Sequence, residues 1–251
     1  SPFSEFITWP LTQLIGQALV GRVDAPQGAT TAAPFQAQRK STLYKSGITL
    51  RAKPPIRKRP EVIAIGSSTG GPQALLEVVK KIKSDVRQPI VITQHMPATF
   101  TTILAQHLGT ASGRQASEGR DGEPLSPGHI YLAPGDYHMT IEGRGSTKVI
   151  RLNQNPPESY CRPAVDPMFR SLAACYGDRI LGVILTGMGS DGCKGADEIV
   201  KVGGTVIAQD EQSSVVWGMP GAVATAGLCE AVIPLDRVSN YINDFVAKGM
   251  P

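Results

Sequence analysis

The amino-acid sequence predicts an α/β fold: a doubly wound, mostly parallel sheet flanked by helices on both faces, with one antiparallel hairpin. Short apolar runs such as Val62–Ile65 and Ile180–Thr186 are bounded by turn-forming residues, as buried strands are. Segments with apolar residues at helical spacing lie between these runs. This alternation is typical of parallel sheets that are wound by right-handed crossovers and covered on both faces.

The elements follow in order from residue 62. After the first strand, helix 73–83 carries apolar residues at helical spacing, and Pro72 suits its first turn. Further strands are expected at 89–94, 129–133, 180–186, 204–208 and 231–234, and further helices at 98–109, 167–176, 193–202 and the C-terminus. Alternating residues at 137–142 and 147–152 predict the hairpin, at an edge of the sheet. Residues 111–127 are expected to form a loop.

Residues 1–60 differ in composition from the rest of the chain. They hold nine Lys and Arg against two Asp and Glu, whereas the remainder holds 16 against 19. We expect a basic, Pro-rich linker here, with a short N-terminal helix around Leu11–Leu19. A folded domain should then span 61–250. Because the basic residues belong to the leading segment, the body gives no electrostatic reason to expect nucleic acid as a partner.

Cysteine spacing and hydropathy exclude several other classes of protein. The four cysteines, Cys161, Cys175, Cys193 and Cys229, lack the C-x-x-C spacing of zinc sites and are expected to be reduced thiols in a cytoplasmic protein. No apolar run is long enough to span a bilayer, and no signal peptide is recognisable. We therefore expect no metal and no membrane insertion, with a monomer as the default state.

The turn at 66–72 is the first candidate for chemistry. Its sequence, Gly-Ser-Ser-Thr-Gly-Gly-Pro, joins the first strand to the first helix. Such a turn either binds an anion or presents a nucleophilic serine beside free backbone N–H groups. It matches neither the usual phosphate-binding patterns nor the G-x-S-x-G elbow. An ordinary Gly/Ser turn is the commoner interpretation of this stretch taken alone.

Two more polar residues directly follow predicted strands. His95 comes after the strand at 89–94, and Asp191 lies in the turn after 180–186. Since the carboxyl ends of parallel strands share one edge, Ser68, His95 and Asp191 are expected to meet there and to form a Ser-His-Asp triad. Alternatives remain open at this point: Ser67 competes with Ser68, His138 competes with His95, and Asp191 could simply cap a helix.

A series of motifs resembles the catalytic domain of the chemotaxis protein-glutamate methylesterases. The resemblance covers about 61–250 and comprises, in order, residues 66–71, 93–97, 133–136, 138–139, 162–163, 165–166, 184–189, 191–192 and 218–220. It implies a doubly wound α/β fold and a Ser-His-Asp hydrolase unrelated in sequence to the common esterases, with Ser68 as nucleophile, His95 as base and Asp191 as the third member. Alanine usually stands where this chain has Ser67. The family also commonly carries an N-terminal receiver domain, for which residues 1–60 are too short.

The resemblance further implies a reaction and its partners. Ser68 would attack glutamate γ-methyl esters of methyl-accepting chemotaxis receptors, and receptor glutamines would be deamidated through the same kind of intermediate. No cofactor is implied. Backbone N–H groups of Thr69 or Met188 are candidates for the oxyanion hole, since both follow glycine-rich turns. Arg162 is a candidate substrate contact, with a structural salt bridge as the alternative.

Two rival hypotheses come from other classes. A binding module of the same fold would recognise receptors without catalysis, but it has no chemical need for serine, histidine and aspartate together. An anion-binding regulatory domain would use the 66–72 turn and would be indifferent to His95. Within the enzymes, a small-molecule esterase is the remaining alternative.

Overall fold

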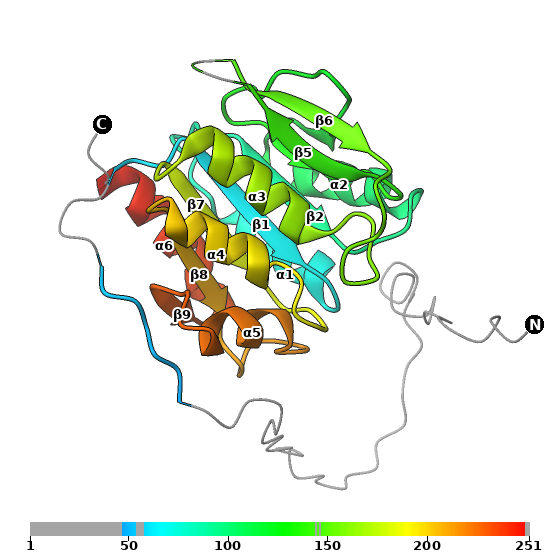
Figure 1. Cartoon of the computed structure of the whole chain (residues 1–251). Coiled ribbons are helices and arrows are strands. Elements are labelled where there is room, and N and C mark those ends of the chain that lie inside the picture. The colour runs from blue at the N-terminus through cyan, green and yellow to red at the C-terminus, as the bar shows by residue number, and fades with distance from the viewer. Residues whose placement is uncertain (1–46, 54–57, 144, 146, 249–251) are drawn as a thin grey trace, which may run out of the picture. The chain divides into compact units, whose positions relative to one another are not determined.

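The structure is a computed structural model that describes residues 47–53, 58–143, 145 and 147–248. Its centre is a seven-stranded, fully parallel sheet in the order β3-β4-β2-β1-β7-β8-β9 (Figure 1). The strands are β1 (Val62–Ser67), β2 (Ile90–Gln94), β3 (Ala116–Glu118), β4 (Ile130–Leu132), β7 (Ile180–Ile184), β8 (Thr205–Gln209) and β9 (Ala231–Ile233). The predicted doubly wound α/β fold is confirmed.

Helices cover both faces of this sheet. The helices are α1 (Gly71–Lys80), α2 (Phe100–Ser112), α3 (Val165–Tyr176), α4 (Cys193–Lys201), α5 (Met219–Thr225) and α6 (Leu235–Lys248). Alternate residues of β1 serve the two sides: Val62 and Ala64 face α3, α4 and α5, while Ile63 and Ile65 face α1, α2 and α6. In Figure 1, α3 and α4 accordingly lie in front of the sheet and α1 behind it. The fully apolar strands follow from this two-sided burial.

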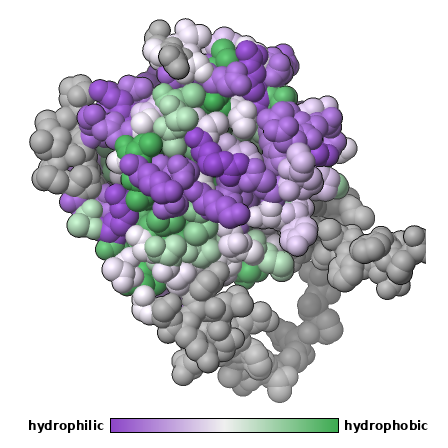
Figure 2. Space-filling model, viewed as in Figure 1, coloured by the Kyte–Doolittle hydropathy of each residue, from purple (hydrophilic) through white to green (hydrophobic). Residues whose placement is uncertain are grey.

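The outer surface over α3 and α4 is mostly hydrophilic (Figure 2). On α4, Lys201 forms ion pairs with Asp197 and Glu198, at 2.7 and 2.8 Å. Apolar residues of the same helices, such as Phe169 and Ile199, are fully buried against the sheet. This division between a charged outer side and an apolar inner side is what periodicity predicts for helices that cover a sheet.

The antiparallel hairpin exists, but it does not join the edge of the main sheet. Strands β5 (His138–Glu142) and β6 (Val149–Asn153) form a separate two-stranded sheet. Ile141 donates its backbone N–H to Ser171 Oγ of α3 at 2.9 Å, and Met139 is buried in the same cluster as Phe169. The hairpin thus packs beside α3, on the same face of the main sheet (Figure 1). The expected edge position was wrong because a period-two pattern predicts a strand pair without naming the surface on which it packs.

Two short elements escaped the sequence analysis. Strand β3 lies within the stretch expected to be a loop; its three residues are only partly buried and give no clear pattern. Helix α5 has seven residues, mostly small ones, and begins with a Met-Pro-Gly segment. Both elements depend on tertiary contacts more than on local sequence.

The expected linker is described only in part, and the predicted N-terminal helix lies outside the described residues. Arg51 donates its backbone N–H to Cys229 O at 2.8 Å and its guanidinium to Gly204 O at 3.3 Å, both beside the β8–β9 end of the sheet. Lys58 pairs with Asp178 at 2.7 Å. The described end of this segment therefore contacts the domain. None of the described helices is both long and apolar enough to cross a membrane.

Candidate active site

Three adjacent strands bring Ser68, His95 and Asp191 to one edge of the sheet. β1 lies between β2 and β7, and its last residue, Ser67, is in register with Gln94, so Ser68 and His95 follow paired positions. His95 N–H donates to Ser67 O at 3.1 Å, and Ser68 N–H donates to Thr186 O at 3.0 Å. Strands that follow β1 in the chain are added first on the β2 side and then on the β7 side, so the strand order switches at β1, which is where open α/β sheets form their ligand sites.

Asp191 is held at the N-terminus of α3. Its carboxylate accepts the N–H groups of Val165 at 2.6 Å, Asp166 at 3.0 Å and Gly192 at 2.9 Å, and its Oδ2 lies 2.7 Å from His95 Nε2. Burial favours the neutral acid, but the hydrogen bonds and the charge of His95 outweigh it and lower the pKa of Asp191. A charged Asp191 accepts a hydrogen bond from Nε2–H of His95. In the neutral ring, Nδ1 is therefore the nitrogen that can act as a base.

His95 has a second side-chain partner that the sequence analysis missed. Cys161 Sγ lies 3.4 Å from His95 Nδ1, on the side of the ring opposite Asp191. Burial lowers the pKa of His95, but hydrogen bonds to Asp191 and Cys161 outweigh it and raise the pKa to about 9. Among the described side chains, the Ser68 hydroxyl forms no hydrogen bond with His95.

Gln94 joins the two loops that carry Ser68 and His95. Its side-chain amide is fully buried and donates to Ser68 O at 2.9 Å and to His95 O at 3.1 Å, while its Oε1 accepts the Ser67 hydroxyl at 2.7 Å. A Cβ at Gly71 would stand 1.9 Å from Gln94 Oε1, so only glycine fits there. Ser67 is thus turned inward, fully buried, and takes part in this clamp. Nothing in local sequence distinguishes Gln94 from any other polar strand end.

Backbone donors are available beside Ser68. A Cβ at Gly187 would stand 2.8 Å from Ser68 Cβ, so the turn at 187–189 passes directly against the serine. In the part of the chain that the structure describes, neither Thr69 nor Met188 uses its N–H in a backbone hydrogen bond. Both candidates for an oxyanion hole therefore keep a free donor next to the hydroxyl.

Arg162 is engaged within the domain. Its guanidinium forms hydrogen bonds to Asp136 Oδ1 at 2.8 and 3.2 Å and to the carbonyls of Gln154 and Asn155, each at 3.1 Å. Those bonds occupy its donors and connect the Pro134–Tyr137 turn to the loop that precedes α3. This geometry favours the structural alternative over a substrate contact.

The competing histidines have structural partners or are remote from the triad. His138 Nε2 donates to Pro156 O at 3.1 Å, while its Nδ1 accepts the Ala164 N–H at 3.2 Å. His129 stacks on Tyr131 and contacts Ser117 Oγ at 2.9 Å. His107 is exposed on α2. Among the described residues, only His95 joins a carboxylate at the carboxyl edge of the sheet.

A second buried carboxyl group lies behind the triad. Asp166, in the first turn of α3, accepts the N–H of Gly195 of α4 at 2.7 Å. Burial raises the pKa of Asp166 to about 6, the Gly195 N–H opposes the shift, and the charge of Asp191 adds to it. The two aspartates therefore cross-link the helices: Asp191, which precedes α4, binds N–H groups of α3, and Asp166, which belongs to α3, binds an N–H group of α4.

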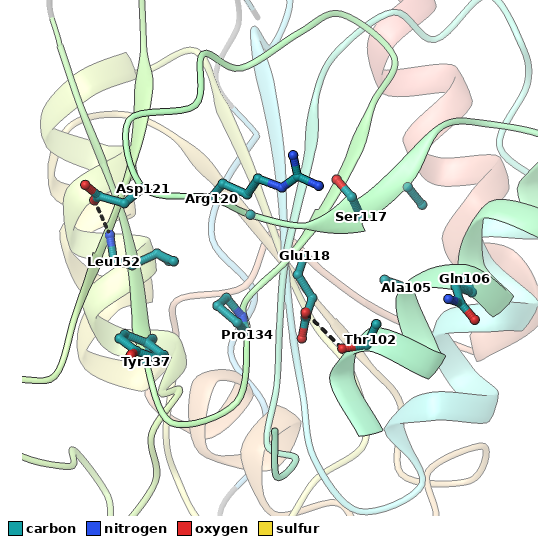
Figure 3. A pocket seen from close by; sticks show the side chains of 12 residues that line it. Thr102, Ala105, Gln106, Ser117, Glu118, Arg120, Asp121, Pro134, Tyr137 and Leu152 are labelled. Carbon is teal, nitrogen blue, oxygen red and sulfur yellow. Dashed lines mark hydrogen bonds between the residues drawn. The ribbon is translucent and has the colours of Figure 1, made fainter. Parts of the chain in front are cut away.

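The described part of the chain contains a cavity of about 510 Å³ apart from the triad. α2, β3, the Pro134–Tyr137 turn and Leu152 line it; Figure 3 shows Thr102 on one side and Tyr137 on the opposite side. Glu118 there accepts the Thr102 hydroxyl at 2.9 Å. None of Ser68, His95 and Asp191 lines this cavity. No group of described His, Cys, Asp or Glu side chains forms a candidate metal site.

Comparison with known proteins agrees with this geometry. The family model described as CheB methylesterase matches residues 63–242. The chain belongs to the CheB methylesterase family. The solved catalytic domain of CheB methylesterase from Thermotoga maritima superposes with a TM-score of 0.73 at 38% identity, covering 74% of this chain and 99% of that one. The resemblance inferred from the motifs is thereby confirmed.

Full-length relatives in this family are longer than the present chain. A protein-glutamate methylesterase/protein-glutamine glutaminase 1 of Paramagnetospirillum magneticum is 61% identical over 202 residues, which are 80% of this chain and 52% of the relative. A protein of the corresponding name from Azospirillum brasilense is 58% identical over 207 residues, again 80% and 52%. The chain thus spans about half the length of these CheB relatives.

Proposed function

We propose that this chain is a protein-glutamate methylesterase that acts on methyl-accepting chemotaxis receptors and also deamidates receptor glutamines. The proposal is carried by one observation: Ser68 lies at the end of β1 beside the His95–Asp191 pair, whose Nε2–Oδ2 distance is 2.7 Å. A hydroxyl next to an imidazole that a carboxylate orients is the arrangement that makes serine nucleophilic. The names of the relatives support both activities.

In the proposed mechanism, Ser68 Oγ attacks the γ-carbonyl carbon of the ester while His95 Nδ1 takes the hydroxyl proton. Asp191 stabilises the resulting imidazolium through Nε2. The N–H groups of Thr69 and Met188 donate to the oxyanion, and loss of one such donor typically lowers turnover by about 10²–10³. His95 then returns the proton to the departing methanol, or to ammonia when glutamine reacts. Water releases the acyl group from Ser68 by the same route.

The surroundings of Ser68 suit a protein substrate. Two cavities in the described part, of about 510 and 470 Å³, include no triad residue. Met188 and Val215 are 67% and 69% exposed, and Val215 Cγ2 would lie 2.6 Å from a Cβ at Gly70. Exposed apolar side chains beside a reactive centre are suited to contact with a receptor helix.

Regulation and cell compartment are further proposals. We propose that residues 1–60 act as a linker to a phosphoacceptor receiver domain in the parent protein, as the family resemblance implies. The greater length of the relatives is compatible with such a domain. We also propose a cytoplasmic site of action, where the four free thiols would stay reduced.

Methanol release from methylated receptor membranes tests the function. The unmodified chain, Ser68→Ala and Ser67→Ala should be compared at equal concentrations. We expect Ser68→Ala to lose about 10³-fold or more of the activity, whereas Ser67→Ala should keep most of it. If the folded parent releases no methanol but binds receptors, the non-catalytic binding module is the better hypothesis. If it cleaves soluble esters only, a small-molecule esterase is favoured.

A further inference from the structure

We propose that Cys161 is a positioning residue that holds His95 in a resting arrangement, because its thiol occupies the ring nitrogen that has to accept the Ser68 proton. The inference rests on the proposed esterase function, which gives that nitrogen its task. It concerns the free enzyme: Cys161 would compete with Ser68 for His95, and productive catalysis would require this contact to open.

Both ring nitrogens of His95 are occupied. Nε2 lies 2.7 Å from Asp191 Oδ2, and Nδ1 lies 3.4 Å from Cys161 Sγ, which is within hydrogen-bond range for sulfur. With a pKa of about 9 the ring is mostly protonated at pH 7, so Nε2–H donates to the carboxylate and Nδ1–H donates to Cys161 Sγ. General-base catalysis needs the lone pair of Nδ1, so Nδ1 must first lose this proton. Ser68 Oγ therefore has no free acceptor on His95 while Cys161 holds Nδ1–H.

The turn that carries Cys161 is firmly built. Glu158 and Cys161 exchange two backbone hydrogen bonds, at 3.1 and 2.9 Å, and the intervening Ser159 and Tyr160 have φ values of 51° and 63°. Non-glycine residues in this left-handed region cost about 1–2 kcal/mol each, so neighbouring contacts must hold the turn. Glu158 supplies one through its ion pair with Arg170 of α3.

On the other side, Arg162 supplies a second anchor through Asp136. The thiol is thus delivered to His95 by a strained turn fixed on both flanks. An arbitrary surface cysteine would not be held in this way. Strain of this kind is kept only where surrounding contacts over-determine the backbone.

The charge state of His95 gives the contact a functional consequence. Burial lowers the pKa of His95, but the hydrogen bonds that the protonated ring donates to Asp191 and Cys161 raise it to about 9. At pH 7 only about one imidazole in a hundred with such a pKa is neutral. Asp191 and Cys161 are the titratable groups in contact with the ring, and Asp166 and Arg170 lie behind Asp191. Removing the sulfur should therefore both free Nδ1 and enlarge the neutral fraction of His95.

Two variants at Cys161 test the inference, with Cys175→Ala as a matched control. Cys175 is also a partly buried thiol, but it contacts Ile141 O near the C-terminal end of α3, whereas Asp191 contacts the N-terminus of this helix. We expect Cys161→Ala to lower the pKa of His95 by about one unit and to raise kcat for methanol release at pH 7 about tenfold, with KM unchanged. Cys161→Ser keeps a hydrogen-bond acceptor at the same place and should stay close to the parent, as should Cys175→Ala.

Histidine titration by NMR separates the inference from the proposed function. The chain has four histidines, so the ring signals can be assigned by substituting His107, His129 and His138. If the His95 signal titrates at the same pH in the parent and in Cys161→Ala, the inference is wrong whatever the activity. A fall in that pH without methanol release from any form would support the Cys161 contact and overturn the esterase proposal. A folded Cys161→Ala protein with a lowered kcat would overturn the competitive role.

Discussion

Asp191 and Asp166 are both buried and both lie at helix N-termini, but their pKa values are shifted in opposite directions. Asp191 precedes α4 and accepts two N–H groups of α3, while Asp166 belongs to α3 and accepts one N–H of α4. Yet the pKa of Asp191 is lowered, whereas that of Asp166 is raised to about 6. Burial acts in the same direction on both. Only Asp191 has an imidazole at 2.7 Å and three N–H donors in all.

The difference shows how many partners a buried carboxylate needs to keep a low pKa. One N–H group does not balance the loss of water around Asp166, and the nearby negative charge of Asp191 adds to the cost. Three N–H groups and a cation do balance it around Asp191. Asp166 is thus a structural link between α3 and α4, whereas Asp191 keeps a low pKa beside His95.

Asp191→Asn should have the largest effect on activity, because it removes the carboxylate that faces His95. The amide Oδ1 would still accept the Asp166 and Gly192 N–H groups, but Nδ2 would replace the oxygen that faces both Val165 N–H and His95 Nε2. A donor at that place favours the His95 tautomer with its proton on Nδ1, which cannot act as base. We expect kcat for methanol release to fall by about 10³–10⁴, and the free energy of unfolding to fall by about 1–3 kcal/mol because Val165 N–H loses its acceptor. Asp197→Asn on the exposed side of α4 is the control. A loss below tenfold would remove Asp191 from the mechanism.

Gly195→Ala should separate the two linked helices. A Cβ at this position would lie 2.5 Å from Phe169 Cβ and 3.2 Å from Asp166 Cα, so α4 would have to move away from α3. We expect a loss of about 2 kcal/mol in the free energy of unfolding, measured with urea. Gly109→Ala on α2, where the nearest atom stands at 3.3 Å, should cost clearly less. Equal losses of unfolding free energy at the two positions would show that α3 and α4 are not packed more closely than α2 is against its neighbours.

Asp166→Asn should change how the free energy of unfolding depends on pH. Because the folded-state pKa of Asp166 is raised above 3.8, its contribution to stability is full below about pH 4 and is lost as pH rises to about 6. The amide does not titrate and still accepts the Gly195 N–H. Relative to the parent, the variant should therefore gain about 1–3 kcal/mol in unfolding free energy between pH 4 and pH 7. Urea unfolding at both pH values measures this, with exposed Asp85→Asn as control; a pH-independent difference would contradict it.

Ser67→Ala tests the contact between Ser67 and Gln94 and should have the smallest effect. It removes one hydrogen bond to Gln94 Oε1 and leaves the two bonds from Gln94 Nε2 to Ser68 O and His95 O in place. We expect a loss of about 1 kcal/mol in unfolding free energy and a change in kcat below about threefold. A large loss of activity without a loss of stability would mean that Ser67 itself takes part in the reaction.

Local sequence predicted most of the fold because strand and helix periodicities are strong in this chain. Strands such as β1 and β7 are apolar throughout and end in glycine-rich turns, so their burial and their polar ends follow from the residues alone. The hairpin was recognised by its alternation, but its packing on α3 was not. Strand β3 and helix α5 were missed because short elements carry too little periodic signal.

The sequence by itself determined the α/β class, the family, and the meeting of Ser68, His95 and Asp191 at one edge. Strand order and direction bring such ends together whatever their separation in the chain. Only the tertiary structure decided that Gln94 clamps the two loops, that Asp166 links α3 to α4, and that Cys161 reaches His95. These contacts join loops and helix ends that have no common period. Their geometry depends on how the elements pack, which no local pattern encodes.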